Sequence, residues 1–97
     1  MRVADQIALS LQECGCEQLY MVTGGASMHL NDALTRVFKD RIICLHHEQS
    51  CAMAAESYAR IRRKPAVVNI TAGPGSINAI NGVFGAYVDS IPMIILS

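Results

Sequence analysis

The residues best suited to chemistry lie in the segment HHEQSCAMAAESYAR, at positions 46–60. There a carboxyl group, that of Glu48, follows two histidines and directly precedes a run of small apolar residues. An apolar wall, to which Cys51, Ala52 and Ala55 could contribute, favours the neutral form of a carboxyl group by desolvation. A neutral carboxyl group can share a proton with a ligand. Glu48 is therefore either a surface charge at the start of a helix or a carboxyl group held at an apolar wall for a function.

Two glycine-containing loops accompany this segment, TGGAS at 23–27 and TAGPGS at 71–76. These loops and the segment with Glu48 each follow a short apolar run that predicts a strand, at 19–22, 41–45 and 66–70. Glycine lets a backbone approach a ligand closely, and proline stiffens a turn. Parallel strands all end at the same edge of their sheet, where open α/β proteins bind ligands. We therefore expect the three loops to form one site.

The hydrophobic pattern alternates between helical and strand-like stretches and predicts an α/β protein. The predicted helices cover residues 3–14, 28–38, 48–61 and 76–88, and the predicted strands cover residues 19–22, 41–45, 66–70 and 93–97. Nearly continuous apolar strands separated by helices are typical of a parallel sheet with helices on both faces, of flavodoxin-like or doubly wound type. Ser27 is expected to cap the second helix, and Gly82 and Gly85 to let the fourth helix pack closely. No closing helix follows the last strand, so we expect the sheet to be incomplete at its C-terminal end.

Composition excludes several classes of function. Hydrophobic residues make up 52% of the 97 residues and charged residues 16%, which fits one small domain with apolar surface left for another domain or subunit. Eight basic and eight acidic residues balance, and the cluster RIRRK at 60–64 fits the solvated end of a helix, so no nucleic-acid partner is expected. No apolar run approaches the roughly 20 residues that span a bilayer, and the first residues lack the features of a signal peptide. We expect a cytoplasmic protein with no membrane partner.

The cysteines predict neither a metal site nor a nucleophile. They are Cys14, Cys16, Cys44 and Cys51, and no two have the C-x-x-C spacing of many zinc sites. We expect reduced, mostly buried thiols and no metal ligands. A nucleophilic pair of one of the last two cysteines with an adjacent histidine lacks an evident third group to orient it.

The glycine loops also raise the question of phosphate binding. The stretch GPGSIN at 73–78 has two glycines of a dinucleotide fingerprint, but Asn78 stands where the third would be. No acidic residue follows at the expected distance, and the P-loop sequence is absent. A flavodoxin-like nucleotide binder, in which Glu48 would be dispensable for ligand affinity, remains an alternative.

Several motifs taken together resemble a known family. The segment HHEQSCAMAAESYAR and the later TAGPGSINAINGVFGAYVDSIPMIILS, at 71–97, are similar to the N-terminal pyrimidine-binding (Pyr) domain of thiamine diphosphate enzymes, the acetolactate synthase-like group in particular. That group carries H-E-Q-x-A-x-x-M-A-x-x-Y-A-R and T-x-G-P-G-x-x-N elements. The resemblance covers essentially all 97 residues. It departs in the first loop, where Thr23 stands in place of the usual proline, so the substrate stays open.

The resemblance implies which residues hold the cofactor. By their place in the motifs they would be Gly24, Gly25, Glu48, Thr71, Pro74 and Asn78. Glu48 takes the place of the catalytic glutamate, whose carboxyl group bonds to the pyrimidine ring nitrogen and so activates the cofactor. None of these residues would bind a metal.

The resemblance also implies a reaction and partners. Residues 1–97 would be a truncated Pyr domain of an enzyme that decarboxylates a 2-keto acid such as pyruvate and transfers the two-carbon unit to a carbonyl acceptor. The diphosphate of the cofactor and its Mg²⁺ would be held by the diphosphate-binding domain of a second subunit, whose G-D-G motif this chain lacks. A homodimer or homotetramer is then expected, and FAD is a further candidate cofactor of the complete enzyme.

Two alternatives to this reaction stay open. Within the same superfamily, a 2-keto acid decarboxylase or an oxidase would carry the same motifs. From a different class, an isolated Pyr domain could act as a non-catalytic module for dimerisation or regulation.

Overall fold

The computed structural model describes all 97 residues and contains one sheet of short parallel strands. The strands are β1 Leu19–Met21, β2 Ile42–Cys44, β3 Ala66–Asn69 and β4 Met93–Leu96. Their order in the sheet is β2-β1-β3-β4, and every neighbouring pair is parallel. The predicted fold class, α/β with a parallel sheet of flavodoxin-like type, is confirmed.

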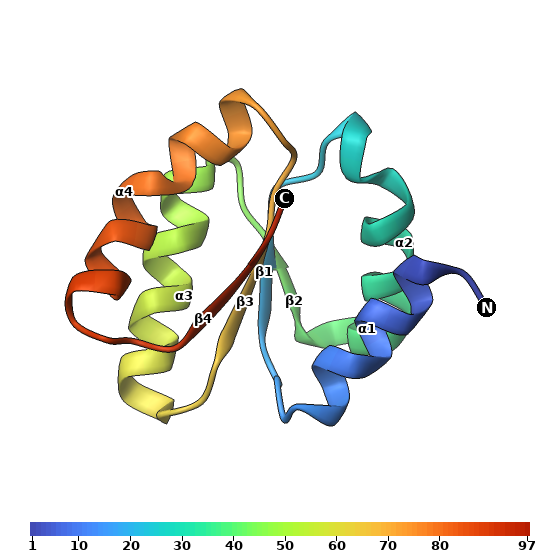
Figure 1. Cartoon of the computed structure of the whole chain (residues 1–97), viewed down its shortest axis with the longest axis horizontal. Coiled ribbons are helices and arrows are strands. Elements are labelled where there is room, and N and C mark those ends of the chain that lie inside the picture. Colours follow the sequence, from blue (N-terminus) through green and yellow to red (C-terminus); the bar gives the residue numbers. More distant parts are fainter.

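Helices cover both faces of this sheet (Figure 1). They are α1 Val3–Glu13 and α2 Met28–Phe38 on one face, and α3 Glu48–Arg62 and α4 Pro74–Val88 on the other, with 3₁₀ turns at Gly25–Ser27 and Lys39–Arg41. α4 begins two residues earlier than predicted because Pro74 occupies the first helical turn. There its fixed φ suits the helix, and its missing N–H would have no partner in any case.

Each face of the sheet has its own hydrophobic core, because successive strand residues point to opposite sides. Leu19 and Val67 pack with residues of α1 and α2, whereas Tyr20 and Val68 pack with residues of α3 and α4. The two central strands, β1 and β3, are buried between these two layers, whereas the edge strands β2 and β4 are half-buried to exposed. The burial of β1 and β3 explains their nearly continuous apolar sequence.

α3 and α4 pack closely where glycine replaces a side chain. A Cβ atom added at Gly82 would lie 2.5 Å from the Cβ of Ala52, and one added at Gly85 would lie 2.6 Å from Oε1 of Glu56. Both distances are shorter than van der Waals contact, so glycine is needed for this approach. The predicted close packing at these two positions is confirmed.

The strand order places the topological switch point of the sheet between β1 and β3. The chain leaves β1 toward α2 on one face and leaves β3 toward α4 on the other, although the two strands are neighbours. Open α/β sheets bind ligands at the carboxyl ends of the strands at such a point. The loops after β1 and β3 lie on either side of it.

The cysteines are free, but the prediction that they are mostly buried is wrong for two of them. Cys16 and Cys51 are buried, whereas Cys14 and Cys44 are exposed. Cys14 directly follows α1, and Cys44 lies in β2, an edge strand with a neighbour on one side only. None of the helices combines the length and the apolar character needed to cross a membrane.

Candidate functional site

The loops that follow β1, β2 and β3 meet at the carboxyl edge of the sheet. A Cβ atom added at Gly24, in the first loop, would lie 2.6 Å from the Cβ of Thr71, in the third. A Cβ atom added at Gly75 would lie 2.9 Å from Cγ2 of Thr71 and 3.4 Å from Oε2 of Glu48. The structure therefore brings Glu48 and residues of both glycine loops into one contact cluster.

Glu48 is the first residue of α3, and the residue before it fixes the start of that helix. Nδ1 of His47 accepts a hydrogen bond of 3.1 Å from the backbone N–H of Gln49. This bond satisfies one of the N–H groups left free at a helix N-terminus. The helix start, and with it the position of Glu48, is thus defined by a neighbouring imidazole.

The two carboxyl oxygens of Glu48 have different surroundings. Nδ2 of Asn78, in the first turns of α4, donates a hydrogen bond of 3.2 Å to Oε1. Oε2 has no hydrogen-bond partner in the chain and lies beside Gly75. The side chain is half-buried. Asn78 therefore orients the carboxyl group and leaves one oxygen available to a ligand.

An apolar wall lies along α3 behind this carboxyl group. Cys51, Ala52 and Ala55 are fully buried and pack in the core beneath α3 and α4. Burial, together with the neighbouring carboxylate of Glu48, raises the pKa of the Cys51 thiol to about 11. This thiol stays protonated at neutral pH, so the structure gives no support to a Cys51–His nucleophile.

Gly75 belongs to the site although sequence reasoning did not assign it there. It is buried between Thr71 and Glu48, and a side chain at this position would fill the space in front of Oε2. The sequence signal that could have identified Gly75 was its position as the second glycine of the GPG triplet. The first, Gly73, has φ +77° and allows the turn into α4.

The remaining predicted residues lie around this cluster. Thr71 is half-buried, and its carbonyl accepts a hydrogen bond of 3.1 Å from the Ser76 hydroxyl. Pro74 is exposed at the start of α4. Gly25 is exposed and a Cβ atom there would meet nothing within 4 Å, so the structure does not bring it into the cluster.

Ser27 does not cap α2 in the way that the sequence predicts. Its hydroxyl donates a hydrogen bond of 3.2 Å back to the carbonyl of Gly24, and it accepts none from the helix. The 3₁₀ turn before α2 places the hydroxyl toward the first loop. The prediction of a capping side chain is wrong, and the residue instead stabilises the glycine loop.

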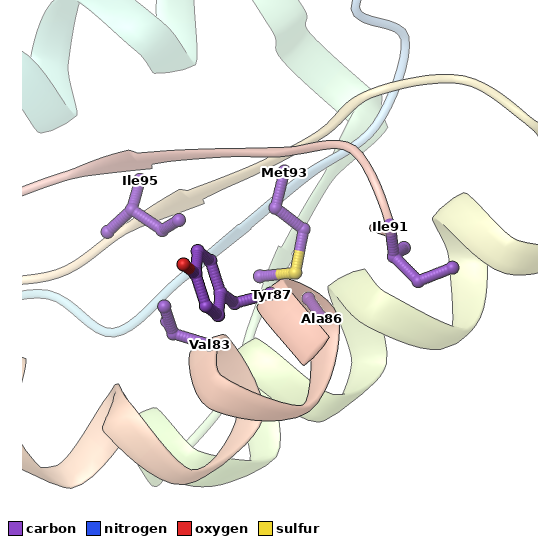
Figure 2. A pocket seen from close by; sticks show the side chains of 6 residues that line it. All are labelled: Val83, Ala86, Tyr87, Ile91, Met93 and Ile95. Carbon is purple, nitrogen blue, oxygen red and sulfur yellow. The ribbon is translucent and has the colours of Figure 1, made fainter. Parts of the chain in front are cut away.

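Three hollows lie near these elements. One of about 300 Å³ lies between α1, the start of α2 and the end of β3, and its lining includes Ala26, Ser27 and Asn69. An open one of about 460 Å³ follows the first loop and is lined by Thr23, Gly24, Gly25, Met28 and Asn31. A third, of about 180 Å³, lies between α4 and β4 and is lined only by hydrophobic residues (Figure 2). Its lining offers no charged or catalytic side chain. No three His, Cys, Asp or Glu side chains come together as a metal site.

Comparison with known proteins gives consistent results. Residues 1–97 match the family described as "Thiamine pyrophosphate enzyme, N-terminal TPP binding domain". Over 94 residues, 97% of this chain, the sequence is 39% identical to the acetolactate synthase large subunit of Buchnera aphidicola subsp. Acyrthosiphon pisum, covering 16% of that protein. It is 38% identical over the same share to the chloroplastic acetolactate synthase of Arabidopsis thaliana, covering 14% of it. The chain thus spans about one sixth of the length of these relatives.

A solved structure with the same fold is the benzoylformate decarboxylase from Polynucleobacter necessarius. The TM-score is 0.79, with 24% sequence identity, and the match covers 98% of this chain and 18% of that one. This likeness supports the arrangement of strands and helices described above.

Proposed function

The chain belongs to the thiamine pyrophosphate enzyme family as an N-terminal TPP binding domain, and from this we propose that it binds and activates the aminopyrimidine of thiamine diphosphate. The proposed enzyme is acetolactate synthase-like: it decarboxylates a 2-keto acid such as pyruvate and transfers the two-carbon unit to a carbonyl acceptor. The observation that carries the proposal is the carboxyl group of Glu48, with Oε1 held by Asn78 and Oε2 free beside Gly75.

The residues of the chain fit the pyrimidine end of this cofactor. When bound, thiamine diphosphate supplies a thiazolium carbon that can carry negative charge after it loses a proton. Oε2 of Glu48 would share a proton with the pyrimidine ring nitrogen. Gly75 leaves this oxygen accessible, because any larger residue would crowd it.

The diphosphate end of the cofactor has no counterpart in the three loops. Residues 22–27, 45–47 and 70–73 contain no Lys or Arg, so the negative charge of a diphosphate would be unpaired there. We therefore assign the diphosphate and Mg²⁺ to the diphosphate-binding domain of a second subunit. FAD, where the complete enzyme carries it, is also assigned to a domain other than this one.

The outer face of α4 offers a surface for that second subunit. Large apolar side chains at helical spacing are exposed there, with exposures between 57% and 80% for Ile77, Ile80, Phe84, Tyr87 and Val88. The opposite face, toward α3, carries only small buried residues, Gly75, Ala79, Gly82 and Ala86. A helix whose large apolar residues face outward leaves apolar surface to be covered.

This surface is continuous with the site, which supports one particular partner. Ile77 precedes Asn78, the residue that orients Glu48. A domain that covers α4 would therefore also border the free oxygen of Glu48. We propose that the diphosphate-binding domain of a second subunit covers this face and completes the cofactor site, in a homodimer or homotetramer.

The cytoplasm is the proposed location. All four cysteines are free, which fits a reducing compartment. The relative from Arabidopsis thaliana is named a chloroplastic enzyme. Fractionation of the host cell would show whether this protein is in the cytoplasm or in an organelle.

Replacement of Glu48 by Gln in the complete enzyme tests the proposed function. Gln keeps the size of the side chain but cannot donate a carboxyl proton, so turnover of pyruvate should fall by about 100-fold or more. Glu56→Gln, on the same helix and paired with Arg60, is the matched control and should retain turnover. Turnover near that of the unmodified enzyme in Glu48→Gln would refute the assignment.

Product analysis of the same enzyme separates the alternatives. A two-carbon transfer product supports the carboligase, a free aldehyde indicates a 2-keto acid decarboxylase, and consumption of an oxidant indicates an oxidase. A complete protein that binds thiamine diphosphate but turns over no 2-keto acid would indicate a non-catalytic module.

A further inference from the structure

Asn69 is the only buried polar residue of the chain, with an exposure of 0%. It ends β3 in the otherwise apolar stretch AVVNI at 66–70. An amide in such a position is unfavourable unless its polar groups find partners. A polar residue in a buried strand is thus a feature that needs an explanation other than core packing.

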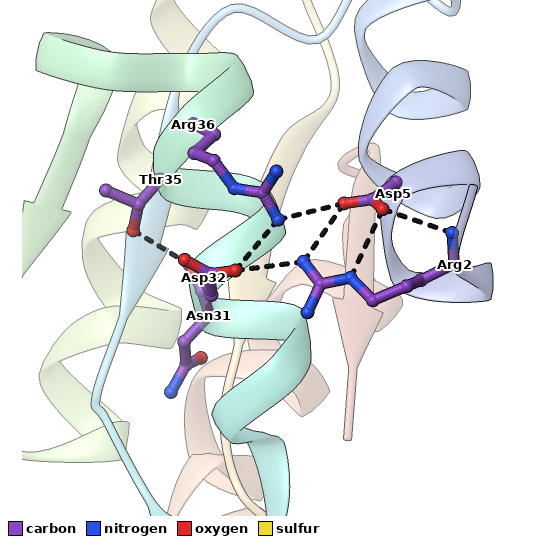
Figure 3. A network of polar contacts seen from close by, with 6 residues as sticks. All are labelled: Arg2, Asp5, Asn31, Asp32, Thr35 and Arg36. Atoms are coloured by element: carbon purple, nitrogen blue, oxygen red, sulfur yellow. Dashed lines mark hydrogen bonds and ion pairs between the residues drawn. The ribbon is translucent and has the colours of Figure 1, made fainter.

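The amide of Asn69 is only half satisfied. Its Nδ2 donates a hydrogen bond to Oδ1 of Asn31, on α2, whereas its Oδ1 is buried without a partner. In Figure 3 the side chain of Asn31 points away from the charged side chains of Arg2, Asp5 and Arg36. The Asn31 side chain therefore faces the sheet, where it bonds to Asn69, and takes no part in the neighbouring ion pairs.

Asn69 holds both ends of the first loop. Its backbone carbonyl accepts a hydrogen bond of 3.3 Å from the N–H of Val22, where that loop begins. Its side chain bonds to Asn31, which lies in α2 just after the loop and lines the open hollow beside Gly24. One buried residue thus forms hydrogen bonds to both ends of the segment 22–31.

The same residue is close to the third loop. Thr71 follows Asn69 by two positions, and its side chain occupies the space that a Cβ atom at Gly24 would need. The distance between the first and third loops consequently depends on how Asn69 holds the first. A small displacement of Gly24 would change its contact with Thr71 and the space next to Glu48.

Fold stability alone does not account for this amide. A leucine of similar size would remove the unpaired Oδ1 and add apolar contacts. Asn31, which is half-buried and lines an open hollow, can bond to water instead, so its amide would not be left without a partner. We propose that Asn69, through Asn31, is a positioning residue that sets the first loop against Thr71 and so shapes the cofactor pocket. The expected effect on cofactor binding rests on the proposed function. The effect of Asn69 on the first loop can be measured without the cofactor.

The first test is hydrogen–deuterium exchange on the complete enzyme without cofactor. In Asn69→Leu and in Asn31→Leu, the amides of residues 23–28 should exchange about tenfold faster, the factor expected for the loss of one such hydrogen bond. Asn31→Asp keeps the acceptor oxygen and should restore slow exchange. Asn81→Leu, at an exposed asparagine of α4, controls for the substitution itself and should leave residues 23–28 unchanged.

The second test is titration of the complete enzyme with thiamine diphosphate and Mg²⁺ in a calorimeter. Asn69→Leu should weaken the Kd about tenfold while the temperature of unfolding stays equal or rises. Unchanged exchange in residues 23–28, or a Kd equal to that of the unmodified enzyme, would overturn the proposal. A lower unfolding temperature with unchanged exchange and Kd would show a purely structural role and overturn it as well.

These outcomes are distinguishable from failure of the proposed function. If Glu48→Gln retained full turnover, the cofactor assignment would fall, whereas the exchange experiment contains no cofactor and would still decide whether Asn69 holds the loop.

Discussion

At the scale of single residues, the carboxyl group of Glu48 depends on three neighbours from different parts of the chain. His47 fixes the helix start through its bond to the next turn, and Asn78 holds one carboxyl oxygen from α4. Gly75 contributes by having no side chain, which keeps the second oxygen accessible. The chemistry proposed for Glu48 is thus a property of this arrangement and not of the glutamate alone.

Gly75→Ala tests the need for this open space. The added methyl group would lie 2.9 Å from Cγ2 of Thr71 and 3.4 Å from Oε2 of Glu48. Such overpacking in a buried position should lower the free energy of unfolding by about 1–3 kcal/mol. We also expect weaker binding of thiamine diphosphate in the complete enzyme, measured by calorimetry.

Gly25→Ala is the control for stability in this experiment. A Cβ atom at Gly25 would meet nothing within 4 Å, so the free energy of unfolding, measured with urea, should stay unchanged. If both alanine variants had the stability of the unmodified protein, the steric role given to Gly75 would be wrong.

At the scale of elements, the two faces of α4 have different roles. Its small residues allow close contact with α3, as at Gly82 and Ala52. Its large apolar residues, among them Ile80 and Phe84, face outward. The first surface fixes the distance between Asn78 and Glu48, and the second is the face proposed for the partner subunit.

The double substitution Ile80→Ser with Phe84→Ser tests the proposed partner face. Both side chains are more than half exposed, so the fold of the chain should keep its unfolding temperature. The complete enzyme should dissociate to smaller species, because the apolar surface that drives association is reduced. Analytical ultracentrifugation at several protein concentrations measures this change.

Ile61→Ser provides the comparison, since Ile61 is 81% exposed near the end of α3. It should leave the sedimentation of the complete enzyme unchanged. An identical sedimentation profile for the α4 double variant would argue against this face as the subunit contact.

At the scale of the whole molecule, ion pairs add to the hydrophobic core that α1 and α2 share. Arg2 and Arg36 bond to Asp5 and Asp32, so that four side chains link α1 with α2 (Figure 3). Hydrogen bonds from Arg2, more than any other influence, lower the pKa of both aspartates below the ordinary value of 3.8. These surface pairs are screened by salt and contribute modestly.

The lowered pKa values predict a loss of stability in acid. A carboxyl group whose pKa is lower in the folded state stabilises the fold above its unfolded pKa, and this contribution is lost as the pH falls through the folded value. The unfolding temperature should therefore fall as the pH drops below about 3.8, the ordinary value for aspartate. Calorimetric scans at pH 6 and pH 3 measure the difference.

Asp32→Asn removes one of these two titrations and should reduce the difference between the two pH values. Asp40→Asn, at an exposed aspartate without an ion pair, should leave it unchanged. Equal acid sensitivity of all three proteins would show that the network on α1 and α2 does not contribute to the pH dependence.

The sequence by itself was enough to determine the order of the elements and the parallel sheet between two helical layers, and it predicted the edge at which the candidate site lies. These follow from local patterns: apolar runs in strands, helical spacing in helices, and glycine loops after strands. The motif around Glu48 and the third loop was sufficient to indicate the family.

Tertiary structure alone decided the contacts between distant residues. The roles of Gly75 and Asn31, the exposure of Cys44 and the inward bond of Ser27 depend on how helices pack against the sheet. Two residues gave a local signal: Asn69 as a polar residue in an apolar strand, and Gly75 as the second glycine of the GPG triplet. Periodicity shows which face of an element is buried, but a distance of a few ångströms between two elements is set by packing, which no local pattern records.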